Sequence, residues 1–168
     1  MKKLLLLVVI ALGTIGLYAQ NDTESMDENP VEVSVEMFQK KAADLVGKDI
    51  YVTGIVDHVC KHGGKKVMLV SEDGEASLKV MAGDKISKFD KNIEGENLKV
   101  LGTVTEFKMD DTFLDEREKK VKEHHKPTDP EYKEDMEWIQ EKREEIKKSK
   151  KGYLSFYSMD GISYEVVK

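Results

Sequence analysis

The stretch Asp49-Ile-Tyr-Val-Thr-Gly-Ile-Val-Asp-His-Val-Cys60 decides the fold class, because its residues have the pattern of a strand that bends. β-Branched and aromatic residues dominate it, and apolar Ile50, Val52 and Val56 alternate with other side chains, as a half-buried strand requires. Gly54 stands in the middle, where it predicts a bulge or a bend. The stretch therefore predicts a curved strand with one buried face.

Two more strands follow it closely. Residues 62–65, His-Gly-Gly-Lys, predict a turn, and residues 66–70 predict the second strand. Glu72-Asp73-Gly74-Glu75 predicts a hairpin turn, after which residues 76–81 predict a third strand. Three strands thus meander consecutively.

The flanking segments complete a barrel. Ser34 predicts the N-cap of a helix that stops before Gly47. The later predicted elements are a short helix over 84–93, a fourth strand over 98–107, and a strand, a turn at 159–161 and a strand over 153–167. This order predicts a mainly β protein with helices, built as a five-stranded Greek-key barrel of the oligonucleotide/oligosaccharide-binding (OB) type.

A charged helical insertion separates the fourth strand from the tail, at about 110–151. Pro127 and Pro130 predict a break between two helices. The second helix has a thin apolar stripe, formed by Tyr132, Met136, Ile139 and Ile146, with Trp138 off its line. Two interpretations remain open: a helical hairpin that rests on the barrel through this stripe, or an arm that binds a partner.

The first nineteen residues have the pattern of a secretory signal peptide. Lys2 and Lys3 precede an apolar run, and Ala19 is the expected cleavage point. No cysteine follows the run for lipid attachment, so we expect a soluble protein that is exported to the periplasm or secreted, without a transmembrane segment after cleavage. Residues 20–33 predict a disordered tether, and residues 34–168 a single domain.

The charge of the chain argues against nucleic acid as a partner. The sequence holds 27 basic and 33 acidic residues, and loss of Lys2 and Lys3 with the leader leaves 25 against 33, a net charge of −8. Proteins that grip a phosphate backbone present clustered Lys and Arg, whereas here the two signs are mixed along the chain.

A candidate metal site lies at the end of the first strand. Side chains two residues apart on a strand project from one face, so His58, Cys60 and His62 share a face and offer ligands for zinc or copper. Neighbouring positions on that face lie about 6 to 7 Å apart. One ion therefore requires the strand to bulge or to end there. The alternative interpretation buries Cys60 in line with Val56 and the other inward residues, and leaves the histidines at the rim.

Other candidate contacts are less concentrated. Lys65, Lys66 and Lys79 supply positive charge to the second and third strands, the usual ligand face of an OB barrel, but these strands carry no aromatic stacking residue. The tail offers aromatic side chains that either stack on a ligand or pack in the core, namely Tyr153, Phe156, Tyr157 and Tyr164. His124 and His125 are a second candidate contact for a metal or haem, or a solvated pair.

Two segments carry a family resemblance: Val46-Gly-Lys-Asp-Ile-Tyr-Val-Thr-Gly-Ile-Val56 and Asn97-Leu-Lys-Val-Leu-Gly-Thr-Val104. Their glycine-centred valine strands resemble exported bacterial OB-fold proteins of the Bacteroidetes type, including the tRNA-anticodon-like group. That resemblance implies an OB barrel and, through the anticodon-like group, nucleic-acid binding.

Several functions follow as hypotheses. The first is a non-enzymatic exported binding module for a small ligand or a protein partner, with contacts at the strand end and the three lysines. The others are a zinc or copper protein that uses His58, Cys60 and His62, a nucleic-acid-binding OB fold, and an adaptor that uses the helical insertion. We expect no enzyme, because no feature designates a nucleophile, a base and an oxyanion site together.

Overall fold

The computed structural model describes residues 30–168. The predicted leader and most of the predicted tether therefore lie outside the described residues. Residues 31–33, which the sequence predicts as the end of the tether, instead belong to strand β1 (Val31–Ser34). Among residues 30–168, no helix combines the length and apolar composition needed to cross a membrane.

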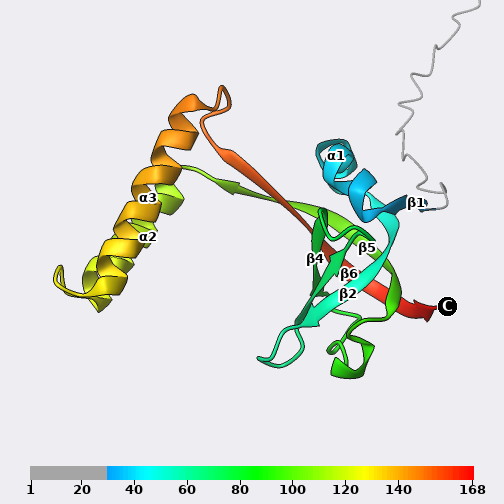
Figure 1. The fold of residues 1–168 in the computed structure, drawn as a ribbon. Helices are drawn as coiled ribbons and strands as arrows, with labels where there is room; N and C mark the ends of the chain where they lie inside the picture. The colour runs from blue at the N-terminus through cyan, green and yellow to red at the C-terminus, as the bar shows by residue number, and fades with distance from the viewer. Residues whose placement is uncertain (1–29) are drawn as a thin grey trace, which may run out of the picture.

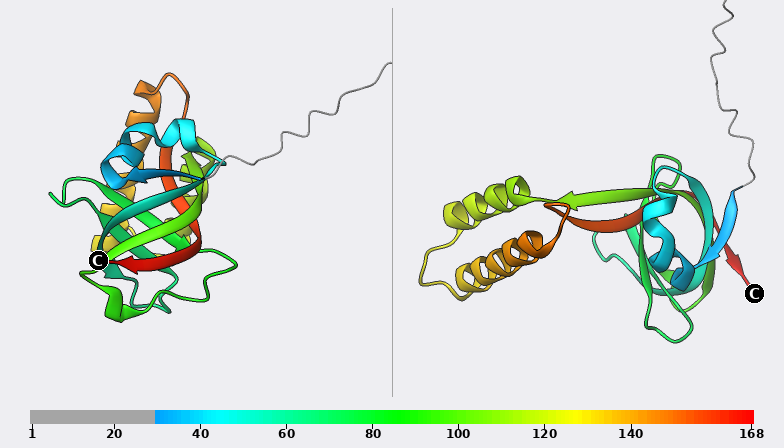
Figure 2. Two further views of the ribbon diagram at one scale, coloured as in Figure 1. Left: turned by 90° about the vertical axis from the view of Figure 1, so that its right-hand side faces the viewer. Right: turned by 90° about the horizontal axis from the view of Figure 1, so that it is seen from above.

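Five strands close into a barrel (Figures 1 and 2). They are β2 (Asp49–Val59), β3 (Lys66–Val70), β4 (Ser77–Ala82), β5 (Asn97–Met109) and β6 (Leu154–Val167). The sheet order is β1-β2-β3-β4-β6-β5, and an antiparallel β2–β5 pairing closes it. The meander from β2 to β4 and the return through β5 and β6 confirm the predicted OB-type barrel.

Helix α1 (Val35–Leu45) forms where the sequence predicts a helix, and it covers part of the barrel. The Ser34 hydroxyl accepts a hydrogen bond from the Met37 backbone N–H at 3.2 Å, which caps the helix. Phe38 is one of the helix residues buried against the barrel. Gly54 of β2 permits this contact, because a Cβ there would lie 2.6 Å from Cγ2 of Val35. The predicted glycine therefore marks a close approach, and the bulge occurs later in the strand.

The barrel interior is apolar. Alternate residues of β3, β4 and most of β2 and β5 point inward, β6 contributes Met159, and the segment between β4 and β5 adds three more side chains. Val52, Leu69, Val80, Leu98 and Met159 are fully buried. Removing this much apolar surface from water is the main stabilising contribution to the barrel.

Two predicted elements are wrong in detail. The predicted helix over 84–93 is an irregular segment that ends in a short 3₁₀ helix (Lys91–Ile93). Its residues Ile86, Phe89 and Ile93 still pack in the core, so an irregular segment can bury apolar residues that are spaced as in a helix. The tail contains no turn at 159–161 and forms one continuous strand, β6. Gly161 serves packing instead, because a Cβ there would lie 2.8 Å from Cδ1 of Ile86.

Most of the helical residues follow β5 rather than lying at the N-terminus. Helices α2 (Asp111–His124) and α3 (Pro130–Lys148) form an antiparallel hairpin, here called the arm, with the predicted break between them. Beyond the barrel, β5 and β6 continue as a two-stranded ribbon in which residues 104–109 pair with residues 154–159. This ribbon, here called the neck, carries the arm away from the barrel (Figures 1 and 2).

The predicted contact between the arm and the barrel is wrong. The apolar stripe of α3 packs against α2, where Leu114, Val121, Ile139 and Ile146 are buried together. Each helix thus covers the other's apolar face, and little apolar surface remains for the barrel. Trp138, predicted to lie off the stripe, packs against this cluster and stacks on Arg117, with 4.8 Å from the guanidinium carbon to the ring centroid.

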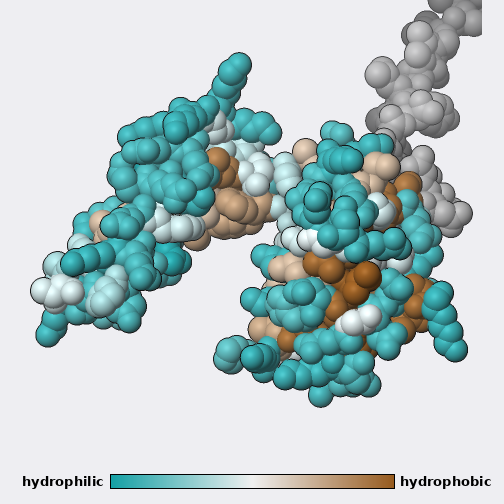
Figure 3. All heavy atoms as spheres, in the orientation of Figure 1, coloured by the Kyte–Doolittle hydropathy of each residue, from teal (hydrophilic) through white to brown (hydrophobic). Residues whose placement is uncertain are grey.

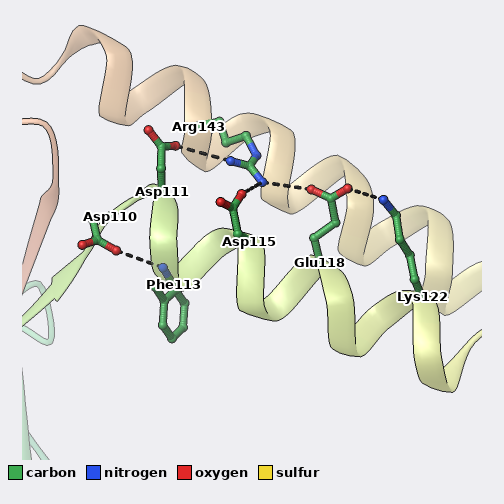
Figure 4. Close-up of polar contacts among 7 residues, drawn as sticks. All are labelled: Asp110, Asp111, Phe113, Asp115, Glu118, Lys122 and Arg143. Atoms are coloured by element: carbon green, nitrogen blue, oxygen red, sulfur yellow. Dashed lines mark hydrogen bonds and ion pairs between the residues drawn. The ribbon is translucent and has the colours of Figure 1, made fainter.

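An ion-pair network joins α2 to α3 (Figure 4). The guanidinium of Arg143 reaches three carboxylates of α2: Asp111 at 3.4 Å, Asp115 at 2.7 Å and Glu118 at 2.9 Å. Lys122 forms a second ion pair with Glu118. Hydrogen bonds from Lys122 and then Arg143 lower the pKa of Glu118, because both stabilise its ionised form.

Candidate binding face

A β-bulge near the end of β2 changes which of its side chains face the core. The register with β3 shifts between Val56 and His58, so Val56 and Val59 are both buried while His58 is exposed. Cys60 is only half-buried. The interpretation that placed Cys60 in line with Val56 is therefore wrong, because the extra residue in the bulge moves Val59 into that place.

The three predicted metal ligands do not form a cluster. His58 Nδ1 lies 2.6 Å from a carboxylate oxygen of Asp57, and His62 is exposed in the turn after β2. Within residues 30–168 no group of three His, Cys, Asp or Glu side chains is arranged to hold a metal ion. His124 and His125 stand at the far end of α2, away from the barrel.

The outer face of β2, β3 and β4 carries an apolar strip. The strip consists of Ile55, Met68, Val70 and Met81, all half-buried on the side of the sheet that faces away from the core. Register places these residues on neighbouring strands, with Ile55 opposite Val70 and His58 opposite Met68. A hydrophobic area within a hydrophilic rim is visible on the barrel below α1 in Figure 3. Half-buried apolar side chains on an outer sheet face are available to a partner.

Lysines border this strip. Lys79 lies opposite Met68, and Lys66 lies opposite Met81, so each strand pair brings a cation beside a methionine. Both lysines are exposed. The structure thus places the predicted residues Lys66 and Lys79 on one face with His58.

The loop after β2 adds further positive charge. Lys65 Nζ donates to the Ser87 carbonyl at 2.7 Å, and Phe89 N–H donates to the Gly64 carbonyl at 2.8 Å, so this loop packs on the segment after β4. Gly64 has φ +64°, and a Cβ there would lie 2.6 Å from the Phe89 carbonyl oxygen, so only glycine fits this contact.

Lysines outnumber acidic residues in the loop after β2 and in β4 with the segment that follows it. Residues 60–66 contain Lys61, Lys65 and Lys66 without an acidic residue, and residues 79–91 contain four lysines, Lys79, Lys85, Lys88 and Lys91, against Asp84 and Asp90. The whole chain carries a net charge of −6. A local excess of positive charge on an acidic protein attracts an anionic partner to that place.

The aromatic residues of the tail divide into core and surface. Tyr164 packs on the core residue Phe89, with 5.2 Å between ring centroids, and Tyr157 also packs against the core. Lys108 lies over the ring of Tyr153 at 5.0 Å. Phe156, by contrast, is 44% exposed on the neck.

Sequence reasoning missed Phe107, the neighbour of Phe156. Phe107 is 45% exposed, and its ring centroid lies 6.3 Å from that of Phe156 and 5.0 Å from that of Phe113. A signal was present in the sequence, because the alternation that buries Leu98, Val100 and Val104 assigns odd-numbered positions of β5 to the outer face.

Several shifted pKa values arise from surface hydrogen bonds and ion pairs, among them those of Glu32, Lys99 and Glu106. A hydrogen bond from Lys99 lowers the pKa of Glu32, and the same contact raises the pKa of Lys99. A hydrogen bond from the Ser155 hydroxyl, 2.6 Å away, lowers the pKa of Glu106. In each case the hydrogen-bond partner favours the charged form of the group.

Topology and core together define the class: a closed five-stranded barrel of the OB type with a helical hairpin between its last two strands. No family model and no curated protein matches the chain.

Solved structures include similar chains, at low identity. The telomere capping protein Ten1 from Saccharomyces pombe is 17% identical over 45% of this chain and 67% of its own, with a TM-score of 0.33. A chain of the S. pombe Stn1–Ten1 complex is 17% identical over 46% of this chain and 65% of its own, with a TM-score of 0.30. A putative aspartyl-tRNA synthetase from Leishmania major Friedlin is 12% identical over 86% of this chain, with a TM-score of 0.41, and this chain spans only 22% of it.

Proposed function

We propose that this chain is a non-enzymatic, exported binding module that holds an acidic, extended segment of a partner protein across the outer face of β2, β3 and β4. The observation that supports the proposal is the apolar strip bordered by lysines. Apolar side chains supply contact area in such a site, and the lysines select a partner of negative charge.

Methionine at the centre of the strip suits a peptide ligand. Met68 and Met81 have unbranched, polarisable side chains that adapt to irregular surfaces, and each lies opposite a lysine on the neighbouring strand. A peptide with alternating acidic and apolar residues would place its apolar side chains on the strip and its carboxylates near Lys66 and Lys79.

A protein partner is favoured over nucleic acid by the composition of this face. Strands β3 and β4 carry no aromatic side chain on which a base could stack. The net charge of −6 for the whole chain opposes long-range attraction of a polyanion. A short acidic segment needs only the local excess of lysine.

A titration of the purified protein with a labelled peptide of alternating Glu and Leu tests this function, with fluorescence anisotropy as the readout. A double variant, Lys66→Glu with Lys79→Glu, should raise the dissociation constant at least tenfold, because two attractive contacts become repulsive. A matched control reverses charge on the arm, at Lys133, which is exposed and far from the strip. This control should bind as the wild type does.

Two results would overturn the proposal. The first is equal binding of the peptide by the wild type and the double variant. The second is tighter binding of a single-stranded oligonucleotide than of the peptide, with the same dependence on Lys66 and Lys79, which would favour a nucleic-acid-binding barrel.

A further inference from the structure

The neck leaves one edge of β5 without a partner strand. Strand β2 pairs with β5 from Asn97 to Thr103, and β6 pairs with it along its full length. Among residues 30–168 no other strand pairs with β5 beyond Thr103. An unpaired edge presents backbone donors and acceptors to any strand of suitable shape.

Alternation along β5 identifies the groups that face this edge. Val104 N–H donates to the Lys48 carbonyl at 3.0 Å, and the Val104 carbonyl accepts from Gly47 N–H at 2.9 Å, so the backbone groups of Val104 point away from β6. Every second residue of a strand points its backbone groups to the same side. The N–H and C=O groups of Glu106 and Lys108 therefore face the open edge.

Side chains of the same residues carry opposite charges. Lys108 Nζ lies 3.6 Å from a carboxylate oxygen of Glu106 on one face of the neck. Phe107, between them in sequence, projects from the other face and is 45% exposed. The edge thus has the order acid, aromatic, base.

We propose that this edge pairs antiparallel with the same edge of a second copy of the chain, about a two-fold axis at Phe107. In that register Glu106 of each copy lies opposite Lys108 of the other, and both residues of each pair have edge-facing backbone groups. Such residues form a hydrogen-bonded pair in an antiparallel ladder, and the residue between them forms the closer, non-hydrogen-bonded pair.

The order of charges selects a second copy as the occupant. A two-fold axis at Phe107 brings each acid opposite a base and each phenylalanine opposite its equivalent, so one surface patch complements itself. Pairing also covers Phe107, whose neighbours Phe113 and Phe156 extend the aromatic surface on the same face. The edge therefore contains the backbone, charge and apolar contacts of an isologous interface.

Charge reversal tests the register. Analytical ultracentrifugation of the wild type over a wide concentration range should show a monomer–dimer equilibrium that weakens as salt is added. Glu106→Lys alone and Lys108→Glu alone should each raise the dimer dissociation constant at least tenfold, because like charges then face each other. An equimolar mixture of the two single variants should restore a dimer, because the copy with two lysines faces the copy with two glutamates.

A proline variant tests the backbone contacts. The Lys108 N–H points away from β6, so Lys108→Pro removes a donor of the open edge while keeping the β5–β6 ladder. Circular dichroism should therefore be unchanged while the dimer is lost.

Three results would overturn the proposal: a wild type that stays monomeric at all concentrations, a mixture of single variants that stays monomeric, or a folded Lys108→Pro variant that still dimerises.

Discussion

The barrel and the arm are stabilised in different ways. Nineteen buried apolar residues form the cluster in the barrel, whereas five form the one between α2 and α3. Seven of the ten ion pairs among the described residues lie within the arm. Burial responds little to pH and salt, while exposed ion pairs respond to both. We therefore expect the arm to open under conditions that leave the barrel folded.

The largest effect should come from a cavity in the barrel. Leu69 and Leu98 are fully buried, and replacing either with alanine should lower the free energy of unfolding by about 2 to 5 kcal/mol. Chemical denaturation followed by far-ultraviolet circular dichroism measures this. A loss below about 0.5 kcal/mol, which is typical of surface substitutions, would show that the barrel does not depend on its interior as described.

A cavity in the arm should act locally. Ile139 is 1% exposed and belongs to the cluster between α2 and α3. We expect Ile139→Ala to destabilise the helical hairpin by about 2 to 3 kcal/mol. Hydrogen exchange should accelerate in α2 and α3 and stay unchanged in β2 to β5. Equal acceleration in the barrel would contradict the separation of the two regions.

Removing the guanidinium of Arg143 should have a smaller effect. Asp111, Asp115 and Glu118 would lose their shared partner, and we expect Arg143→Met to weaken the arm by about 1 kcal/mol, given the exposure of the carboxylates. Hydrogen exchange of α2 is again the readout. Lys119→Met is the control for a single pair, because Lys119 makes one ion pair, with Glu123, among the described residues. A control effect as large as that of Arg143→Met would show that the network adds nothing beyond a single pair.

Acid should give the smallest effect. The pKa of Glu118 is lower in the folded arm than in an unfolded chain, so its ion pairs stabilise the arm fully above the unfolded value of about 4.3. That contribution is lost as pH falls through the lower, folded pKa. The protection of α2 against exchange, measured relative to the intrinsic exchange rate at each pH, should therefore fall at acid pH before that of β2 does. Glu118→Gln should remove most of this pH dependence, and an unchanged profile would assign it to other carboxylates.

Local signals in the sequence were sufficient for much of the fold. Helix α1 begins after Ser34 and ends before Gly47, as predicted, and Asp73 and Gly74 form the predicted hairpin turn. Caps and turns are predictable because they depend on a few neighbouring residues. The tail was mispredicted for a non-local reason. Glycine is a common turn residue, but a glycine is needed at position 161 because a larger residue would collide with the nearby Ile86.

The candidate site was only partly predictable. Lys66 and Lys79 were identified because they lie on the second and third predicted strands, the usual ligand face of an OB barrel. Cys60 was misplaced in one interpretation because the bulge between Val56 and His58 changes which residues face inward. Such a bulge depends on pairing with β3, and no residue type at that position predicts it. The contact of α2 with α3 was missed because the apolar stripe of α3 fits either partner.

The arm also has a mechanical property that follows from its attachment. Helix α3 has 19 residues, which corresponds to a length of about 28 Å at 1.5 Å per residue. Only the two strands of the neck connect the arm to the barrel, so a rotation at the neck moves the whole arm. A rotation of about 10° there would displace the tip by about 5 Å over this length. A contact that twists β5 against β6 is thus amplified at the end of the arm, where His124 and His125 lie.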